Sequence, residues 1–414
     1  MRVNVWKRAL AALAGCTLLM AAGCGGGDTG SAVSSQGGAS ASTGTSTSTS
    51  AAAPETTTTQ TPASQTESQQ TQAPTTTAAP QPNGERTTDI GIWYSTWYAK
   101  EGPYLWIDGH GYGSVGQFLE DVNGDGKITI GYISKNLVDP FHAPINAAAQ
   151  EIFDQMKKDG KIDDWTGILD GETDPNKQID RADECITKNC DMVIILPAEA
   201  TASDPAVTKM ADAGIHVIVV NSKTDSTDKV AVSYCGSDDV YAGELLAKWV
   251  IEQVPDGGKY AHCQGIIGNS AQIQRGEGLA NTMKDHPEFE SVGDFPCDWA
   301  ADKAANVATD MMNKYGDDLK AIICDNDDMS SAAQRACNDA GRKDIVCVGV
   351  DGNQKPLEMV KAGEMGATVL QDGVGQVKAA VSVIDAIIAG QSFEKENIVP
   401  FVLVTKDNVD QYLK

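Results

Sequence analysis

The stretch DMVIILPAEATASDPAVTKMADAGIHVIVVNS, residues 191–222, decides the fold. Two continuous apolar runs, VIILP and HVIVV, flank a segment of helical periodicity that we expect to form a helix over 203–213. Apolar runs without polar alternation are typical of parallel strands that are covered on both faces. Because parallel strands need a crossover connection, the helix between them completes a βαβ unit.

The same alternation of strand and helix continues through the rest of the chain from residue 127. Further strand-like runs are KITIGYI, TGILD, VAVSYCG, YAHCQGIIG, KAIICDND, IVCVGVD and GATVLQD, with a short run near Gly293. Helical periodicity predicts further helices over 144–156, 174–187, 238–253, 274–284, 301–315, 328–340, 354–361 and 374–389. We therefore expect an α/β fold of two similar doubly wound parallel-sheet lobes joined by a hinge. The first lobe is predicted over 127–235 and the second over 236–352, with 353–414 supplying hinge crossings and completing both lobes.

The first 88 residues do not have the composition of a folded domain. Residues 1–24 combine basic residues, an apolar run and the ending AAGC, as in a bacterial lipoprotein signal, which predicts lipidation of Cys24. An ordinary signal peptide cleaved elsewhere is the alternative. Residues 25–88 are rich in Ser, Thr, Ala, Gln and Pro and predict a disordered tether. The expected location is the extracellular face of the cell membrane, held by a lipid anchor.

Composition excludes several kinds of partner. The formal net charge of −25 argues against nucleic acid as a partner and gives no sign of binding to an anionic membrane surface. Apart from Cys16 and Cys24, eight cysteines remain, and their pairing does not follow from spacing. The five histidines are scattered, which argues against a metal cluster.

The predicted ligand site lies just beyond the strands, because ligands of open parallel sheets bind outside the carboxyl ends of the strands. There the chain places carboxylates, amides, an arginine and aromatic rings rather than a phosphate loop. Carboxylates, amides and a guanidinium can each pair with adjacent hydroxyl groups, and an aromatic face suits the C–H surface of a sugar ring. The candidates are Asp139, Phe141, Asn221, Arg275, Trp299, Asn326, Asp351 and Gln371. The alternatives are core packing for the two rings, a surface position for Arg275 and helix capping for Asp351 and the pair Asn326 and Asp327.

Several of these segments, in this order, resemble the type I periplasmic sugar-binding proteins. They are SKNLVDPF, VIVVNSK, GNSAQIQRGEG, CDWAADKA, ICDNDDMSSAAQRA, VGVDGN and ATVLQD. The chain is most similar to the glucose/galactose-binding branch. The resemblance implies that Phe141 and Trp299 sandwich the sugar ring while the polar candidates contact its hydroxyls.

Two departures bear on the sugar. Gln371 stands where the hexose branch usually has Asn and the ribose branch Gln. A ribose-type protein would carry Asp-Arg where this chain has Asn221-Ser222, so the resemblance disfavours ribose. An aldohexose is expected, with xylose and inositol as alternatives.

Residues 89–126 form an aromatic-rich extension that the resemblance does not explain. Its end, DVNGDGK, places Asp121, Asn123, Asp125 and the Lys127 carbonyl as in an EF-type calcium loop, but the acid expected at the twelfth position is replaced by Tyr132. Calcium therefore requires a remote carboxylate, and a metal-free turn is the alternative. No cofactor is otherwise expected.

The predicted function is that of an extracytoplasmic solute-binding lipoprotein. It would capture a monosaccharide by hinge closure, as a monomer, and deliver it to an ABC permease. A sugar-sensing module for a chemoreceptor or histidine kinase is the alternative. We do not expect an enzyme, because capping or sugar-holding roles account for the carboxylates and no nucleophile is apparent.

Overall fold

The βαβ unit predicted from residues 191–222 is present. Strand β6 (Met192–Ile195) and strand β7 (His216–Asn221) pair in parallel, with Met192 opposite His216. Helix α4 (Asp204–Asp212) connects them. All four residues of β6 and five of the six of β7 are buried, as expected for strands covered on both faces.

The computed structural model describes residues 93–94, 104–107, 111–114 and 120–413. They fall within one compact unit of the chain, Thr75–Lys414. The predicted signal segment 1–24 with Cys24, the predicted tether 25–88 and much of the extension 89–126 lie outside the described residues.

The first lobe is built on a seven-stranded sheet with the order β1-β15-β8-β7-β6-β4-β5. Its other strands are β1 (Trp93–Tyr94), β4 (Thr129–Ser134), β5 (Asp164–Asp170), β8 (Ser233–Gly236) and β15 (Glu396–Ile398). All neighbours pair in parallel except β1, which runs antiparallel to β15. Strands β2 (Tyr104–Ile107) and β3 (Gly111–Ser114) form a separate antiparallel pair.

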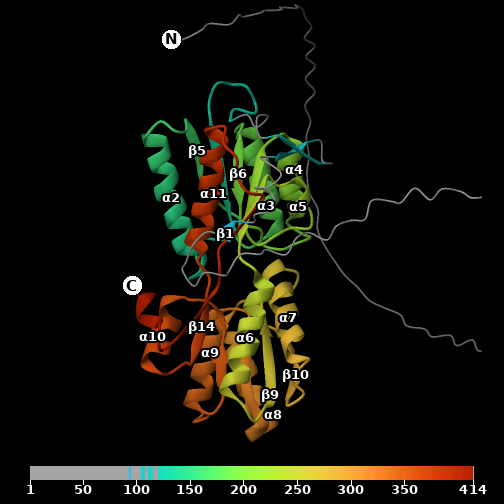
Figure 1. Ribbon diagram of the computed structural model, residues 1–414, viewed down its shortest axis with the longest axis vertical. Helices are drawn as coiled ribbons and strands as arrows, with labels where there is room; N and C mark the ends of the chain where they lie inside the picture. The colour runs from blue at the N-terminus through green and yellow to red at the C-terminus, as the bar shows by residue number, and fades with distance from the viewer. Residues whose placement is uncertain (1–92, 95–103, 108–110, 115–119, 414) are drawn as a thin grey trace, which may run out of the picture. The chain divides into compact units, whose positions relative to one another are not determined.

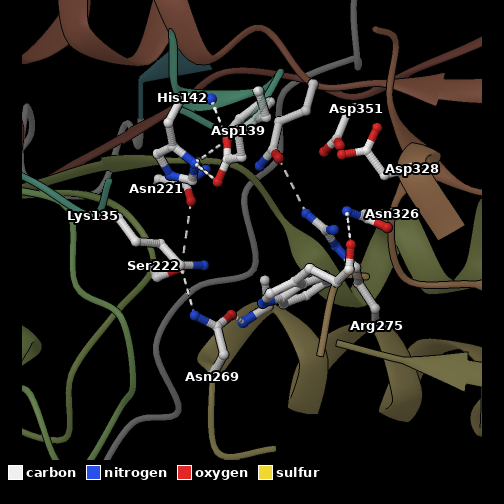
Figure 2. A pocket seen from close by; sticks show the side chains of 14 residues that line it. Lys135, Asp139, His142, Asn221, Ser222, Asn269, Arg275, Asn326, Asp328 and Asp351 are labelled. Carbon is white, nitrogen blue, oxygen red and sulfur yellow. Dashed lines mark hydrogen bonds and ion pairs between the residues drawn. The ribbon is translucent and has the colours of Figure 1, made fainter. Parts of the chain in front are cut away.

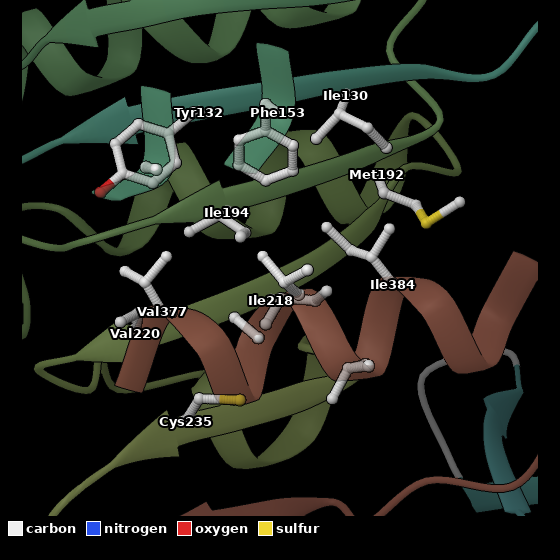
Figure 3. Packing of buried hydrophobic residues seen from close by; sticks show 14 of the residues in the cluster. Ile130, Tyr132, Phe153, Met192, Ile194, Ile218, Val220, Cys235, Val377 and Ile384 are labelled. Atoms are coloured by element: carbon white, nitrogen blue, oxygen red, sulfur yellow. The ribbon is translucent and has the colours of Figure 1, made fainter. Parts of the chain in front are cut away.

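Two hydrophobic clusters cover the two faces of this sheet. On one face, Ile130, Ile194 and Ile218 pack against helix α2 (His142–Lys158) and helix α11 (Gly373–Ile388), as Figure 3 shows for α11. On the other face, Ile133, Val193 and Val219 pack against α4 and helix α3 (Pro175–Thr187), and the short helix α5 (Thr227–Val230) lies beside α4. Alternate residues of each strand therefore face opposite helical layers.

The second lobe contains a parallel sheet of order β10-β9-β11-β12 and a three-stranded sheet of order β13-β14-β16. The first comprises β9 (Gly258–Gln264), β10 (Phe289–Pro296), β11 (Leu319–Cys324) and β12 (Val346–Val348). The second comprises β13 (Val350–Asp351), β14 (Ala367–Leu370) and the antiparallel β16 (Val402–Thr405). The surrounding helices are α6 (Asp239–Gln253), α7 (Ser270–Met283), α8 (Ala301–Tyr315), α9 (Asp327–Asp339) and α10 (Gln354–Ala362) (Figure 1).

The chain passes between the lobes three times. Residues 237–238 connect β8 to α6, residues 371–372 connect β14 to α11, and residues 399–401 connect β15 to β16. We call these segments the first, second and third crossings. Helix α11, although late in the sequence, packs on the first sheet, so the last crossings complete both lobes.

The start of helix α7 differs from the sequence prediction, and the state of the cysteines, which the sequence left open, is now defined. Helix α7 begins at Ser270, four residues before the predicted start, because the Asn269 side chain accepts a hydrogen bond from Ala271 N and caps the helix. The eight cysteines between Cys185 and Cys347 are all buried, free thiols.

Within the described ranges, no helix combines the length and apolar composition needed to cross a bilayer.

Candidate ligand-binding site

One cavity brings together all eight residues that the sequence nominated (Figure 2). Its volume is about 70 Å³, several times the roughly 10–15 Å³ that one water molecule needs. A cavity of this size suits a small molecule rather than a polymer. Its lining is Lys135, Asp139, Phe141, His142, Asn221, Ser222, Asn269, Ala271, Arg275, Trp299, Asn326, Asp328, Asp351 and Gln371.

The segment after β4 forms one wall. The Asp139 carboxylate accepts hydrogen bonds from Asn136 Nδ2 at 2.6 Å and from both the backbone N and Nδ1 of His142, at 2.6 and 2.8 Å. Burial favours the protonated acid, but these bonds outweigh it and hold the pKa of Asp139 well below its usual range. Asp139 is therefore a fixed carboxylate at the cavity wall.

His142 lines the cavity and is buried, and its second ring nitrogen, Nε2, has no partner among the described residues. Burial lowers the pKa of His142 despite the neighbouring Asp139 carboxylate, so the ring is neutral near pH 7. Because Nδ1 donates to Asp139, Nε2 carries a lone pair and is a hydrogen-bond acceptor without a partner among the described residues. The Phe141 ring packs on the core of the first lobe and lines the cavity as well.

Lys135, which was not among the predicted contacts, reaches into the cavity from the same wall. Lys135 is 6 % exposed, and its ammonium lies 5.2 Å from the centroid of the Trp299 ring. Burial lowers the pKa of Lys135, an effect that the nearby Asp139 opposes. In the described part of the chain, no carboxylate lies within 4 Å of this ammonium, so it can donate to a ligand.

Trp299 comes from the second lobe and depends on an unusual backbone. Both Asp298 and Trp299 have positive φ, at 52° and 65°, in the segment that follows β10. The indole lies against Gly265, where a Cβ atom would come within 2.1 Å of the ring. The Trp299 Nε1–H group is buried and has no partner in the described structure. The ring is therefore placed to stack and to donate.

Arg275 is buried, not on the surface of α7. Its Nε donates to the Asp239 carboxylate at 2.9 Å, Nη1 donates to the Asp325 carbonyl, and Nη2 donates to Gln371 Oε1 at 3.1 Å. With its acceptor held by Arg275, Gln371 is left with a buried Nε2 group that has no described partner. Arg275 thus orients Gln371 toward the cavity.

Acidic side chains form the wall near α9. Asn326, not Asp327, is the N-cap of α9, because its Oδ1 accepts from Met329 N. Asp327 instead accepts from Gly352 N, Asn353 N and Thr368 Oγ1, and so holds the turn that carries Asp351. Asp327 follows the N-cap as the first residue of α9, and from there its carboxylate accepts the hydrogen bonds that hold the turn after β13.

Asp328 and Asp351 point their carboxylates to the same part of the cavity (Figure 2). Burial, followed by the Asp327 carboxylate, raises the pKa of Asp351 well above its usual range, and Asp328 contributes. Burial and Asp139 likewise raise the pKa of Asp328. Each acid can accept a hydrogen bond from a ligand O–H group, and the raised pKa values favour protonated forms that can also donate one.

Six lining residues were not among the predicted contacts: Lys135, His142, Ser222, Asn269, Ala271 and Asp328. Each directly follows a strand or begins a helix at the carboxyl ends of the strands, so position alone was the available signal. Residue type gave no help, because lysine and aspartate in such places are usually exposed.

The predicted calcium loop closes on its own hydrogen bonds. The Asp121 carboxylate accepts from the backbone N of Gly124, Asp125 and Gly126, and Asn123 Nδ2 donates to Asp191. Among residues 120–413, no group of three or more His, Cys, Asp or Glu side chains is placed to hold a metal ion. The structure therefore lends no support to calcium at Asp121, Asn123, Asp125 and Lys127.

A ligand cavity between two doubly wound lobes defines a solute-binding protein, and comparison with known proteins agrees. Residues 130–392 match the family described as "periplasmic binding protein domain", more than half of the chain, and the chain belongs to this family. The predicted type I periplasmic sugar-binding fold is confirmed. Proteins of this family are binding proteins, not enzymes, and need no cofactor.

Relatives and solved structures lie at moderate distance. The chain is 28 % identical to a xylitol-binding protein of Mycolicibacterium smegmatis, over 57 % of this chain and 67 % of that one. It is 28 % identical to a ribose import binding protein of Salmonella typhimurium, over 69 % of this chain and 93 % of that one. An ABC transporter solute binding protein of Bacillus halodurans with bound myo-inositol aligns with a TM-score of 0.64 at 27 % identity, covering 70 % of this chain and 98 % of that one. These comparisons do not distinguish the predicted glucose/galactose-binding branch from the other sugar-binding proteins of the family.

Proposed function

We propose that this protein captures one neutral monosaccharide or cyclic polyol outside the cytoplasm and delivers it to an ABC permease. The observation that carries the proposal is the lining of the cavity. The aromatic residues Phe141 and Trp299 line one small space with His142 and Gln371, and His142, Trp299 and Gln371 each carry a buried nitrogen atom that has no described partner. Buried polar atoms are rarely left unpaired in folded proteins, so these three are the natural contacts of a polar ligand.

The chemistry of the lining matches hydroxyl groups. Asp139, Asp328 and Asp351 supply acceptors for O–H donors, while Trp299 Nε1 and Gln371 Nε2 supply donors for hydroxyl oxygens. A hydroxyl group serves both sets, because it donates once and accepts twice. The apolar faces of Phe141 and Trp299 suit the C–H surfaces of a ring, and we infer that they lie on its two sides.

Closure of the lobes around the ligand is the proposed mechanism of capture. Several hydrogen bonds already join the lobes at one edge of the cavity: Asn269 Nδ2 donates to Ala198 O at 2.8 Å, and Ala200 N donates to Gly268 O at 2.9 Å. A ligand that contacts both walls favours the closed arrangement because only there are both sets of contacts satisfied.

A six-carbon sugar or cyclic polyol is our preferred ligand. Ser222 lines the cavity where the resemblance to ribose-type proteins would place an arginine, and a serine leaves more room. The aldohexose predicted from the sequence fits this space, as do inositols. The named relatives widen the choice to ribose and xylitol. Native mass spectrometry of protein purified from rich medium tests the assignment, because a retained adduct of hexose mass and one of pentose mass differ by one CHOH unit. Adduct-free protein that binds no added sugar would refute it.

We further propose that the protein works on the outer face of the cell membrane, anchored through a lipidated Cys24. The AAGC ending of the signal segment supports this, and multiple acyl chains hold a protein stably in a membrane. Replacement of Cys24 by Ser is expected to release the protein from the membrane fraction. Retention of the variant there would contradict the anchor.

A further inference from the structure

A chain of three buried hydrogen bonds leads from the cavity to the crossings. Asn221 Nδ2 donates to Gln376 Oε1 at 3.0 Å, Gln376 Nε2 donates to Ser237 Oγ at 2.8 Å, and Ser237 Oγ donates to the Val399 carbonyl at 2.7 Å. Gln376 is 0 % exposed, and both ends of its amide are used. A long polar side chain in such a place must be fully hydrogen-bonded to be tolerated.

The chain of bonds reaches the first and third crossings and passes through the helix that follows the second. Ser237 belongs to the first crossing, and Val399 begins the third. Gln376 lies in the first turn of α11, directly after the second crossing. The third crossing is also bonded to the end of β8, directly before the first crossing, because Val399 N donates to Gly236 O at 2.7 Å. Asn221 ends β7 and lines the cavity.

Gln376 also fixes how Asn221 is presented. Asn221 holds a positive φ of 69°, a conformation that asparagine tolerates better than most residues. Because one N–H of its Nδ2 is committed to Gln376 and its Oδ1 accepts from Ser222 Oγ at 3.4 Å, its second N–H and the other lone pair of Oδ1 are left for a ligand. Apart from Gln376, the only described side-chain hydrogen bond to the Asn221 amide is the longer one from Ser222 Oγ, at 3.4 Å.

We propose that Gln376 is a positioning residue that presents Asn221 to the ligand and links that contact to the crossings about which the lobes move. This rests on the proposed function, in which the cavity binds a sugar. A ligand that contacts Asn221 would then also stabilise the conformation of the crossings, because the Gln376 side chain is bonded to both Asn221 and Ser237.

A matched control exists in the same fold. Gln334 is also a buried glutamine with both amide ends used, since Nε2 donates to Ile345 O at 3.1 Å and Oε1 accepts from Cys347 N at 2.9 Å. Its bonds tie α9 to β12 inside the second lobe and reach neither Asn221 nor a crossing. Loss of Gln334 therefore reproduces the stability cost of a buried amide without the proposed coupling.

The experiment compares Gln376→Leu, Ser237→Ala and Gln334→Leu with the native protein in two measurements. The first is amide hydrogen exchange of ligand-free protein, followed in peptides that cover 234–240 and 396–402. We expect exchange there to rise at least about tenfold in Gln376→Leu and about threefold in Ser237→Ala, with no rise in Gln334→Leu after correction for global stability. Unchanged exchange in Ser237→Ala, which removes only one hydroxyl, would overturn the coupling, as would an equal rise in Gln334→Leu.

The second measurement is titration with myo-inositol. Gln376→Leu is expected to weaken binding at least about tenfold and Gln334→Leu less than twofold. Equal affinity in the native protein and Gln376→Leu would overturn the positioning role. A native protein that does not bind myo-inositol or any other sugar counts against the proposed function, and the exchange measurement, which needs no sugar, then decides the coupling alone.

Discussion

The ammonium of Lys135 and the indole of Trp299 lie 5.2 Å apart across the cavity, although the two residues belong to different lobes. The first follows β4, and the second follows β10. A buried cation without an ion-pair partner within 4 Å retains N–H groups that can donate. An oxygen atom of a sugar bound in the cavity is the partner that we expect for them.

We expect replacement of Lys135 by Met to weaken sugar binding about tenfold or more. Met keeps most of the length and apolar stem and removes the charged donor, and a hydrogen bond to a charged group contributes roughly 1.5–3 kcal/mol. Isothermal titration measures the change. Lys314→Met is the control, because Lys314 lies 4.9 Å from the centroid of the Tyr315 ring but lines no part of the cavity. Equal affinity of the two variants would rule out a ligand contact for Lys135.

Gly265→Ala is expected to impair binding through Trp299. A Cβ atom at Gly265 would lie 2.1 Å from Cη2 of the indole, so the ring must move, at a cost in stability of roughly 1–3 kcal/mol. Tryptophan fluorescence and titration report the displacement and the loss of affinity. Gly276→Ala in α7 is the control, since its Cβ would meet only His262 Cε1, at 3.7 Å. Native affinity in Gly265→Ala would show that the indole position is not needed.

Stability is expected to fall in alkali because of His262. Burial disfavours its charged form, but Asp325 at 2.9 Å and Asp294 at 3.0 Å outweigh burial and raise the pKa of His262 to about 9. A folded-state pKa above the unfolded value gives a stabilisation that is complete below about pH 6.5 and is lost as pH rises through about 9, roughly 3 kcal/mol in all.

Thermal unfolding between pH 6 and pH 10 measures this loss. His262→Gln is expected to be less stable at pH 7 and to show a smaller further loss by pH 10. His286→Gln, at a partly exposed position, serves as the control and should follow the native profile. A native profile that is flat from pH 7 to pH 10 contradicts the assignment.

Folding and sugar binding are expected to be independent of calcium. The oxygens of Asp121 and Asn123 already accept backbone N–H groups, and the family needs no cofactor. The midpoint of thermal unfolding in EDTA should match that in millimolar calcium within about a degree. A rise of several degrees on adding calcium, abolished in Asp121→Ala, would instead establish the calcium loop.

The sheet framework was predictable because its signal is local. Runs such as VIILP and HVIVV can be buried on both faces only in a covered parallel sheet, and these became β6 and β7. The short strands β15 and β16 escaped prediction, since they are three and four residues long and are specified by pairing with distant strands. The early start of α7 depended on the cap at Asn269, which a hydrophobic pattern does not reveal.

The site was predictable where topology alone places residues together. All eight candidates lie at the ends of strands or in the segments and helices that follow them, and the shared carboxyl edge of parallel strands brought them to one cavity. Lys135 was missed because a lysine after a strand is usually solvated, and Asp328 because an acid in the first turn of a helix is accounted for by the helix dipole. Their burial arises from the opposite lobe or the neighbouring turn, which only the folded chain supplies.

The central claim, that one sugar-sized ligand binds between the rings of Phe141 and Trp299, is tested most directly by isothermal titration of the native protein and Trp299→Ala. The panel comprises D-glucose, D-galactose, D-allose, D-ribose, D-xylose, xylitol and myo-inositol. We predict one site per chain, micromolar or tighter, for at least one of them, and at least about tenfold weaker binding in Trp299→Ala. No binding across the panel, or binding that is undiminished in Trp299→Ala, would contradict the account.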